Sequence, residues 1–321
     1  MKLKPTTYAP ILFGVILILT EIATVVGRII EGVSVDAFLS STIIRLIVFL
    51  LPLAFYCRVT EFDVVSGLKF RSVPVKRVPF LINMALIFFV GSMLFRYAGL
   101  FLFDSEAFLE TPAAVCFTAK SRNSFLHFLG TMILPALLEE VAFRGVLLEN
   151  YRSYGASWSV FTTALMFAMF HLSAENLAYY LFMGVILGVM TLASDSIVPA
   201  ILLHVGINAS YEYLRPGVVE YLRQAGKSLI LPYLLLALFM ILFIFMFSGL
   251  ENIYRSKSYQ EVLESRKELL RKELEKARAA QREEKKETRG KRFLRILREI
   301  YLSPTFLICI VLFICLVSDV L

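Results

Sequence analysis

Cysteine and histidine are scarce in this sequence, and their scarcity excludes several kinds of protein. The 321 residues contain four cysteines, without the spacing of a disulfide framework or a cysteine metal site: Cys57, Cys116, Cys309 and Cys315. Only three histidines occur, and no HExxH motif for zinc accompanies them. A GxGD carboxylate pair is also absent, as is a serine in a glycine-rich loop that a histidine could activate. The common zinc, aspartyl and serine hydrolases of membranes are therefore poorly supported.

Charge is scarce outside one segment near the C-terminus. Between Glu251 and Ser303 there are 16 Lys and Arg against 10 Glu, so this segment supplies most of the formal net charge of +7. The remainder of the chain is nearly neutral. Because the basic excess is local, the net charge does not indicate a nucleic-acid partner, and we expect none.

Long apolar runs dominate the rest of the chain. Hydrophobic residues make up 58% of the sequence and the mean hydropathy is +0.72. Since about 20 apolar residues span a bilayer as a helix, we predict an all-α polytopic transmembrane bundle. The expected spans are Ala9 to Ile30, Ala37 to Cys57, Pro79 to Phe103, Ser124 to Leu148, Ala156 to Ser173, Asn176 to Ala193, Ile197 to Leu214, Ser228 to Leu250 and Pro304 to Val320. The first is too long for a signal peptide. Gly184 and Gly188 form a GxxxG motif, which predicts close helix packing.

This pattern divides the chain into three parts. We expect an eight-helix core over residues 1–250, a charged cytoplasmic helical segment over 251–303 and a ninth span over 304–321. Basic residues flank the first span and fill the loop after the second, so the positive-inside rule predicts a cytoplasmic N-terminus. The basic amphipathic stretch 291–302 is typical of a segment that contacts anionic lipids. An ordinary charged linker helix is an equal alternative.

The stretch LPALLEEVAFRG, Leu134 to Gly145, places three charges inside an apolar run. Such charges are costly at membrane depth, which makes them functional candidates. At 100° per residue, Glu140 and Arg144 share one helix face, whereas Glu139 points about 100° from Glu140. Our hypothesis is that Arg144 pairs with Glu140 and leaves Glu139 free to act as a base.

Two of the histidines stand in a repeated context. Phe167 and His171 are spaced i, i+4 in FAMFH, and His204 and Asn208 have the same spacing in HVGIN. Each pair therefore shares a helix face. Together with the glutamates, these residues could supply a base, a group that orients water and two donors to an oxyanion, which are the components of hydrolysis by an activated water. His127 has no such company and is interpreted as an interhelical hydrogen-bonding residue.

Arg45, Arg96 and Glu21 also lie within or near predicted spans. We expect them to pair with other groups or to extend toward the membrane interface. We do not count these three residues among the candidate catalytic groups.

In this order, EEVAFR, FAMFH and HVGIN resemble the EExxxR, FxxxH and HxxxN motifs of the CAAX-protease and bacteriocin-processing family. That family includes the type II CAAX prenyl endopeptidases, the Ras-converting enzymes. The resemblance covers about Ser124 to Leu214 and implies a glutamate peptidase with a cavity open to the cytosol. It implies that Glu139 and His171 activate water and that His204 and Asn208 stabilise the oxyanion. The implied substrate is a membrane-anchored peptide, prenylated where the host has prenylation.

Other functions stay open at this point. A non-catalytic scaffold or immunity protein could keep the helix bundle, although it would not need these buried polar groups. A metal-dependent peptidase could bind zinc through one carboxylate and two imidazoles. We rank it below the version without a cofactor, because the resemblance favours glutamate chemistry.

The predicted spans raise one geometric difficulty. At 1.5 Å per residue, Glu139 and His204 lie about 10–13 Å from the basic ends of their helices, but His171 lies about 22 Å from its own. We expect tilted or offset helices to bring the three side chains together.

Overall fold

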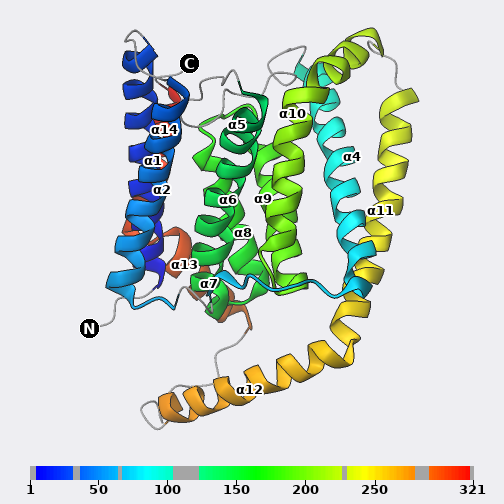
Figure 1. Cartoon of the computed structure of the whole chain (residues 1–321). Coiled ribbons are helices and arrows are strands. Elements are labelled where there is room, and N and C mark those ends of the chain that lie inside the picture. The colour runs from blue at the N-terminus through cyan, green and yellow to red at the C-terminus, as the bar shows by residue number, and fades with distance from the viewer. Residues whose placement is uncertain are drawn as a thin grey trace.

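A computed structural model of the chain describes residues 5–31, 37–63, 67–103, 123–225, 230–278 and 289–318. Within these ranges the ordered elements are all helices, and no strand occurs (Figure 1). Most helices run between the two ends of one bundle, and successive connections alternate between those ends. The predicted all-α, multi-pass membrane architecture is confirmed.

The helix boundaries follow the apolar runs closely. The bundle helices before the charged extension are α1 (Pro5–Glu31), α2 (Ala37–Thr60), α4 (Val78–Phe103), α8 (Ala156–Phe170), α9 (Leu177–Ser194), α10 (Val198–Ala225) and α11 (Ile230–Arg255). From Ser124 to Tyr151 the chain is continuously helical but changes helix type, as α5 (Ser124–Phe128), η3 (Leu129–Ile133), α6 (Leu134–Glu140), η4 (Val141–Leu147) and α7 (Leu148–Tyr151). Both η3 and η4 are π-helical. The extension forms α12 (Lys257–Arg278), α13 (Arg289–Tyr301) and α14 (Pro304–Ser318).

Nine spans were predicted, and their exact number stays a prediction. In the described part of the chain, five helices are long and apolar enough to cross a membrane, and the pair α13 and α14, bent by 55°, makes up to six. The apolar helices Ala156–Phe170 and Val198–Ser210 are shorter. Their place in the centre of the bundle gives the reason, since neighbouring helices surround them and they need not cross the whole bilayer alone.

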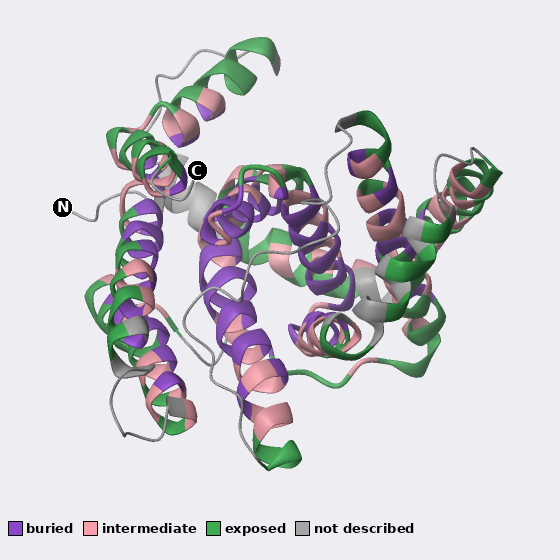
Figure 2. Cartoon of the chain, turned by 90° about the horizontal axis from the view of Figure 1, so that it is seen from above, coloured by how far each residue is buried: buried purple, intermediate pink, exposed green. Residues whose placement is uncertain are grey.

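The helices form three groups that lie side by side. Helices α1, α2 and α14 pack together on one side, α6, α8, α9 and α10 form the centre, and α4 and α11 lie on the other side (Figure 1). Buried residues concentrate on the central helices, whereas α1, α2, α4 and α11 expose large apolar side chains outward (Figure 2). This distribution is expected of a bundle whose outer helices face lipid.

The GxxxG motif brings α8 and α9 into close contact. A Cβ added at Gly184 would lie 2.8 Å from the Cα of Ala164, and one at Gly188 would lie 3.2 Å from a methyl group of Val160. The predicted close packing is confirmed. It sets the spacing of two helices that contribute to the site described below.

The C-terminal helix α14 is joined to α1 at a proline. Pro10 lies inside α1 and has no N–H to donate, so the carbonyl of Thr6 loses its usual helical partner. The hydroxyl of Thr305 donates to that carbonyl at 3.2 Å, and the thiol of Cys309 donates to the carbonyl of Pro10 at 3.1 Å. The last helix therefore satisfies backbone groups of the first.

Helix α13 packs beneath α8 instead of lying wholly free. Ile296 and Ile300 are buried, and the ring centroids of Phe293 and Trp158 are 5.3 Å apart. The hydroxyl of Tyr301 lies 3.0 Å from that of Thr162. Part of the apolar face of the stretch 291–302 is thus used within the protein, and its contact with anionic lipids stays a prediction.

Candidate active site

Glu140 lies at the centre of a buried ion-pair cluster. Its side chain is 0% exposed, and its Oε1 accepts a hydrogen bond from Arg144 Nη1 at 2.8 Å, so the predicted pairing is confirmed. The same oxygen lies 2.8 Å from Nδ1 of His204 in α10. Arg144 also donates from Nη2 to the carbonyl of Gly184 in α9 at 3.2 Å. One carboxylate therefore links the helix that carries the glutamates to α10 directly and to α9 through Arg144.

Glu139 takes no part in this ion pair, although it is adjacent in sequence. Its residue is 7% exposed, and its Oε2 has no hydrogen-bond partner among the residues that the structure describes. Nε2 of His204 lies 3.8 Å from that oxygen. His204 thus stands between one carboxylate held at 2.8 Å and a second, more loosely placed one at 3.8 Å. A buried oxygen without a partner is unusual in folded proteins and is typical of functional positions.

His171 directly follows the last residue of α8. Its Nδ1 lies 2.8 Å from the carbonyl oxygen of Phe167, and because a carbonyl only accepts, Nδ1 carries the proton. Nε2 of the neutral ring then has a lone pair that can accept a proton. The ring stacks on Tyr180 of α9 with centroids 3.8 Å apart. This aromatic contact, which the sequence did not reveal, fixes the plane of the imidazole.

Phe167 separates the two histidine rings. Its ring centroid lies 4.6 Å from that of His171 and 5.9 Å from that of His204, and the side chain is fully buried. The guanidinium carbon of Arg144 lies 4.4 Å from the same centroid. Phe167 therefore packs against each of the three groups and excludes water between them.

Asn208 lies one turn after His204 on α10 and anchors that helix to the chain before Glu139. Its Nδ2 donates to the carbonyl of Met132 at 3.2 Å, within π-helical η3. Pro135 follows η3 and has no N–H, so the preceding turn contains carbonyls that need partners from elsewhere. The contact uses one of the two amide hydrogens of Asn208, and the other is not required for it.

Arg45 of α2 is a member of this cluster that was not identified from the sequence. Its residue is 3% exposed, and Nη1 donates to the carbonyl of Gly130 in η3 at 3.0 Å. Its Nη2 has no hydrogen-bond partner in the described part of the chain, and the charge is close enough to Glu139 to interact with it. A lone arginine in an apolar run was the available signal. The carbonyl that it binds lies 85 residues away, and no sequence pattern connects the two.

Glu140 and His204 lie at the same depth in the bundle. Lys69 contacts Glu149 at 2.9 Å and Asp195 at 3.4 Å, so the ends of α7 and α9 lie at the same level. Glu140 precedes Glu149 by nine residues and His204 follows Asp195 by nine. Oε1 of Glu140 and Nδ1 of His204 are 2.8 Å apart, so the two side chains meet at the same depth above that level.

The difference in depth between His171 and the glutamates is smaller than the sequence predicted. His171 follows Phe167 by four residues, and the ring of Phe167 contacts both His204 and Arg144. His171 therefore lies about one helical turn, roughly 5 Å, beyond the glutamates. The aromatic ring of Phe167 bridges this offset.

The surroundings of the site differ between the two ends of the bundle. Toward the basic end, residues 142–148 are all buried. Toward the opposite end, Asn208, Thr131 and His127 are half-buried and Glu212 is exposed. Nε2 of His127 lies 3.5 Å from Oε1 of Glu212, which agrees with an interhelical role for that histidine. If the basic end is cytosolic, these polar residues lead away from the cytosol, unlike the cytosolic cavity that the resemblance implies.

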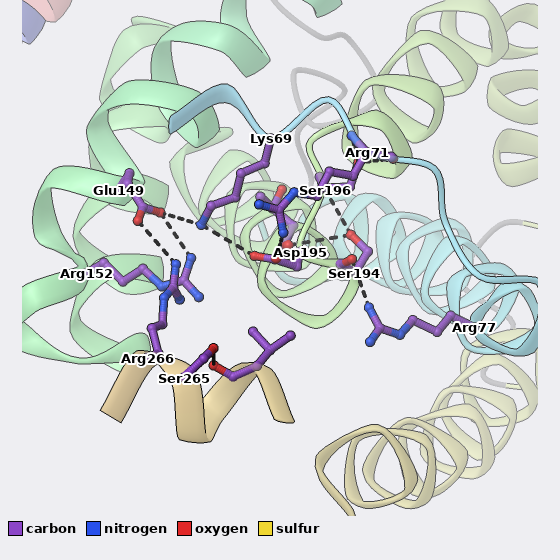
Figure 3. Close-up of polar contacts among 12 residues, drawn as sticks. Lys69, Arg71, Arg77, Glu149, Arg152, Ser194, Asp195, Ser196, Ser265 and Arg266 are labelled. Carbon is purple, nitrogen blue, oxygen red and sulfur yellow. Dashed lines mark hydrogen bonds and ion pairs between the residues drawn. The ribbon is translucent and has the colours of Figure 1, made fainter. Parts of the chain in front are cut away.

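An ion-pair network closes the basic end beneath the site (Figure 3). Besides the contacts of Lys69, Arg152 Nη1 lies 3.0 Å from Glu149 and Arg71 Nη1 lies 2.6 Å from Asp195. Burial alone would raise the pKa of the Glu149 carboxyl, but Arg152 and Lys69 together hold that pKa below its usual 4.5. Burial also lowers the pKa of Lys69 below its usual 10.5, and the two carboxylates offset this only in part. The network thus favours an ionised Glu149.

Helix α12 lies along this network. Arg266 of α12 lies 3.6 Å from Glu149, so the charged extension faces the ion pairs that close the bundle (Figure 3). The arginine is 37% exposed, and such a contact contributes little stability by itself.

Among the described residues, no group of three or more His, Cys, Asp or Glu side chains is arranged to hold a metal ion. Glu139, His171 and His204, the set considered from the sequence for zinc, are therefore not placed as a ligand set in this conformation. The reaction without a cofactor that the sequence led us to expect stays a prediction.

The comparisons with known proteins point to one family. The family model described as type II CAAX prenyl endopeptidase Rce1-like matches residues 121–210, and this is a family of proteases. No curated protein and no solved structure matches the chain significantly. The matched region contains all three motifs and every member of the cluster except Arg45. Residues 121–210 are thus similar to the type II CAAX prenyl endopeptidase Rce1-like family, and they lie in an integral multi-pass membrane protein.

Proposed function

We propose that the protein is an intramembrane glutamate peptidase that cleaves a peptide bond near the C-terminus of a membrane-anchored substrate. The observation that carries the proposal is the division between the two glutamates. Oε2 of each glutamate lacks a hydrogen-bond partner in the described structure, but Oε1 of Glu140 is held at 2.8 Å by both Arg144 and His204. The ion-pair contact of Glu139 is the longer one, 3.8 Å from Nε2 of His204. A group that must accept and return a proton cannot be held in a permanent ion pair.

In the first step, Glu139 accepts a proton from a water molecule and the water oxygen attacks the substrate carbonyl carbon. The lone pair on Nε2 of His171 accepts the second hydrogen bond of that water and orients it. The electrons of the carbonyl double bond move to its oxygen, which gives a tetrahedral intermediate. His171 is held for this task by its bond to Phe167 and by the ring of Tyr180.

The oxyanion of the intermediate needs donors. The free amide hydrogen of Asn208 and Nε2 of His204, when protonated, are suitable. Glu140, whose Oε1 lies 2.8 Å from Nδ1, holds the ring of His204 in position. Glu139 then returns its proton to the amide nitrogen, the carbon–nitrogen bond breaks and the new carboxyl group is released.

The substrate that fits the family best is a CAAX-like peptide held in the bilayer by its prenyl chain. In a host without prenylation, we expect a leader peptide or the tail of a membrane protein. We also propose that the N-terminus is cytoplasmic. Lys69, Arg71, Arg77 and Arg152 lie close together (Figure 3), and the segment between α2 and α4 that carries three of them is at the end of the bundle where α1 begins (Figure 1).

The test is cleavage of fluorogenic prenylated CAAX peptides by the full-length protein purified in detergent. Wild type is compared with Glu139→Gln and with Glu264→Gln, which changes the same chemical group on an exposed face of α12. Each is assayed with and without a zinc chelator. We expect cleavage by wild type and by Glu264→Gln, none by Glu139→Gln, and no effect of the chelator. Full activity of Glu139→Gln would overturn the assignment of the base, and loss with the chelator followed by recovery with zinc would favour a metal enzyme.

A further inference from the structure

Two adjoining hollows lie at the basic end of the bundle, on the face opposite α1. The first has a volume of about 560 Å³ and lies between the start of α4 and the end of α11; it is called the polar pocket for the charged and amide groups in its mostly apolar lining. Its lining includes two cations and two amides, Lys76, Arg77, Asn83 and Asn252. Gly249 lets the two helices approach here, since a Cβ at that position would lie 2.6 Å from the ring of Phe80.

The second hollow is an apolar groove of about 1020 Å³ among α8, α9 and α11. Val160, Val189 and Ile244 represent its lining, which is almost entirely aliphatic and aromatic. Ser248 and Ile253 line both hollows, so the polar pocket adjoins the groove. A single ligand with a polar head and an apolar chain could occupy both.

The charges around the polar pocket favour an anionic head. Lys76 is exposed, and Arg77 is fixed at the rim by donating from Nη1 to the carbonyl of Ser194 at 2.9 Å. The one carboxylate on the groove wall, Glu251, is paired with Arg255 at 2.6 Å. The pocket is therefore positive where it meets the interface, and basic pockets between transmembrane helices are suited to phospholipid head groups.

The position of the groove favours a lipid chain over a soluble ligand. Ile244 is 66% exposed and Phe247 is 58% exposed, and both lie on α11, a helix that is apolar enough to span the membrane. The residues of α8 that line the groove lie between Ala156 and Phe161, so Val160 is about 10 Å along the helix axis from Phe167. The groove is thus separate from the catalytic cluster.

We propose that an anionic phospholipid binds here, with its phosphate between Lys76 and Arg77 and one acyl chain along the groove of α8, α9 and α11. The ammonium and guanidinium groups donate to the phosphate oxygens, and the amides of Asn83 and Asn252 lie beside the glycerol region. The site holds α11, which otherwise contacts mainly α4, against the central helices.

Native mass spectrometry of the full-length protein tests this site directly. Phosphatidylglycerol and phosphatidylcholine with identical acyl chains are added separately to detergent-purified protein. We expect wild type to retain phosphatidylglycerol preferentially. Lys76→Gln should weaken phosphatidylglycerol about fivefold and phosphatidylcholine less, because the choline cation already offsets the phosphate charge. Lys267→Gln, which removes one charge from α12, serves as the matched control and should bind like wild type.

The groove is tested by filling it. Ile244→Trp should weaken both lipids, because the indole occupies the volume of the chain, and its exposed position allows the larger residue without disturbing the core. Val189→Phe makes the same test from α9. Equal retention of the two lipids by wild type would overturn the proposal, as would Lys76→Gln behaving like Lys267→Gln, or groove variants that bind like wild type.

Discussion

The same isosteric change at the two adjacent glutamates should affect different properties of the protein, stability in one case and activity in the other. Glu139→Gln and Glu140→Gln each replace one carboxylate oxygen by an amide nitrogen at nearly constant volume. Glu140 neutralises Arg144, whose side chain is 1% exposed, and also holds His204. Glu139 has an oxygen without a hydrogen-bond partner in the described structure. Glu140 is therefore predicted to determine stability, and Glu139 is predicted to determine activity.

The expected magnitudes follow from burial. Removing one partner of a buried ion pair leaves an uncompensated charge and costs about 3–5 kcal/mol. For a chain of this length, such a loss lowers the Tm by roughly 10 °C. Glu139→Gln loses no hydrogen bond to Oε2, so its free energy of unfolding should change by less than about 1 kcal/mol. Its cleavage rate should fall by a factor of about 10² to 10⁴, the usual contribution of a general base.

The assay combines thermal unfolding in detergent with peptide cleavage, both on the same preparations. Activity alone does not separate the variants, because Glu140→Gln also disturbs His204 and should cleave slowly. The pair of readouts does separate them, since only Glu140→Gln should unfold early. A Glu139→Gln variant that unfolds as early as Glu140→Gln would refute the division of roles, and so would a Glu140→Gln variant with the stability of wild type.

Three further predictions concern the framework of the site. Gly184→Ala should destabilise the protein by about 1–3 kcal/mol and slow cleavage, since its Cβ would meet the backbone of Ala164, whereas Gly206→Ala, with no atom within 4 Å of the added Cβ, should be neutral or stabilising in thermal unfolding. Arg45→Met should cut the cleavage rate about tenfold or more by removing the donor to Gly130 and the charge near Glu139. Arg45→Lys should recover part of the lost rate. Equal rates for the two variants would contradict a role for the charge. Because the pKa of Glu149 is lowered by folding, its ion pairs stabilise the protein above pH 4.5 and lose this contribution as the pH falls further. Glu149→Gln should therefore flatten the dependence of Tm on pH in that range, and the free energy of unfolding involved should be no more than about 1 kcal/mol. An unchanged acid slope would show that the pairs contribute nothing.

The helices and their order could be predicted from the sequence because hydrophobic length is a local property. The runs beginning at Ala37 and Pro79 coincide closely with α2 and α4. The number of full spans could not be predicted in this way. A short apolar run such as 156–170 does not show whether neighbouring helices will surround it, and the π-helical turns in 129–147 depend on tertiary partners for their carbonyl groups.

The site was predictable where spacing within one helix decides the contact. The pairing of Glu140 with Arg144 follows from i, i+4 geometry, and so does the exclusion of Glu139 from that pair. Contacts between helices could not be derived in this way. Arg45 reaches Gly130, and Tyr180 stacks on His171, through the arrangement of separate helices, which no local pattern encodes.

The extension after α11 is built into the bundle, although the motifs that indicate function all lie before it. Pro10 leaves the carbonyl of Thr6 without a helical partner in a membrane-spanning helix, where an unsatisfied carbonyl costs several kcal/mol. Thr305 of α14 satisfies that carbonyl. Loss of α14 would therefore expose a polar group of α1 to lipid, and α1 packs against α2, which carries Arg45. A deletion of residues 251–321 would act on the site through stability, so any change in cleavage must be compared with Thr305→Val before it is assigned to regulation.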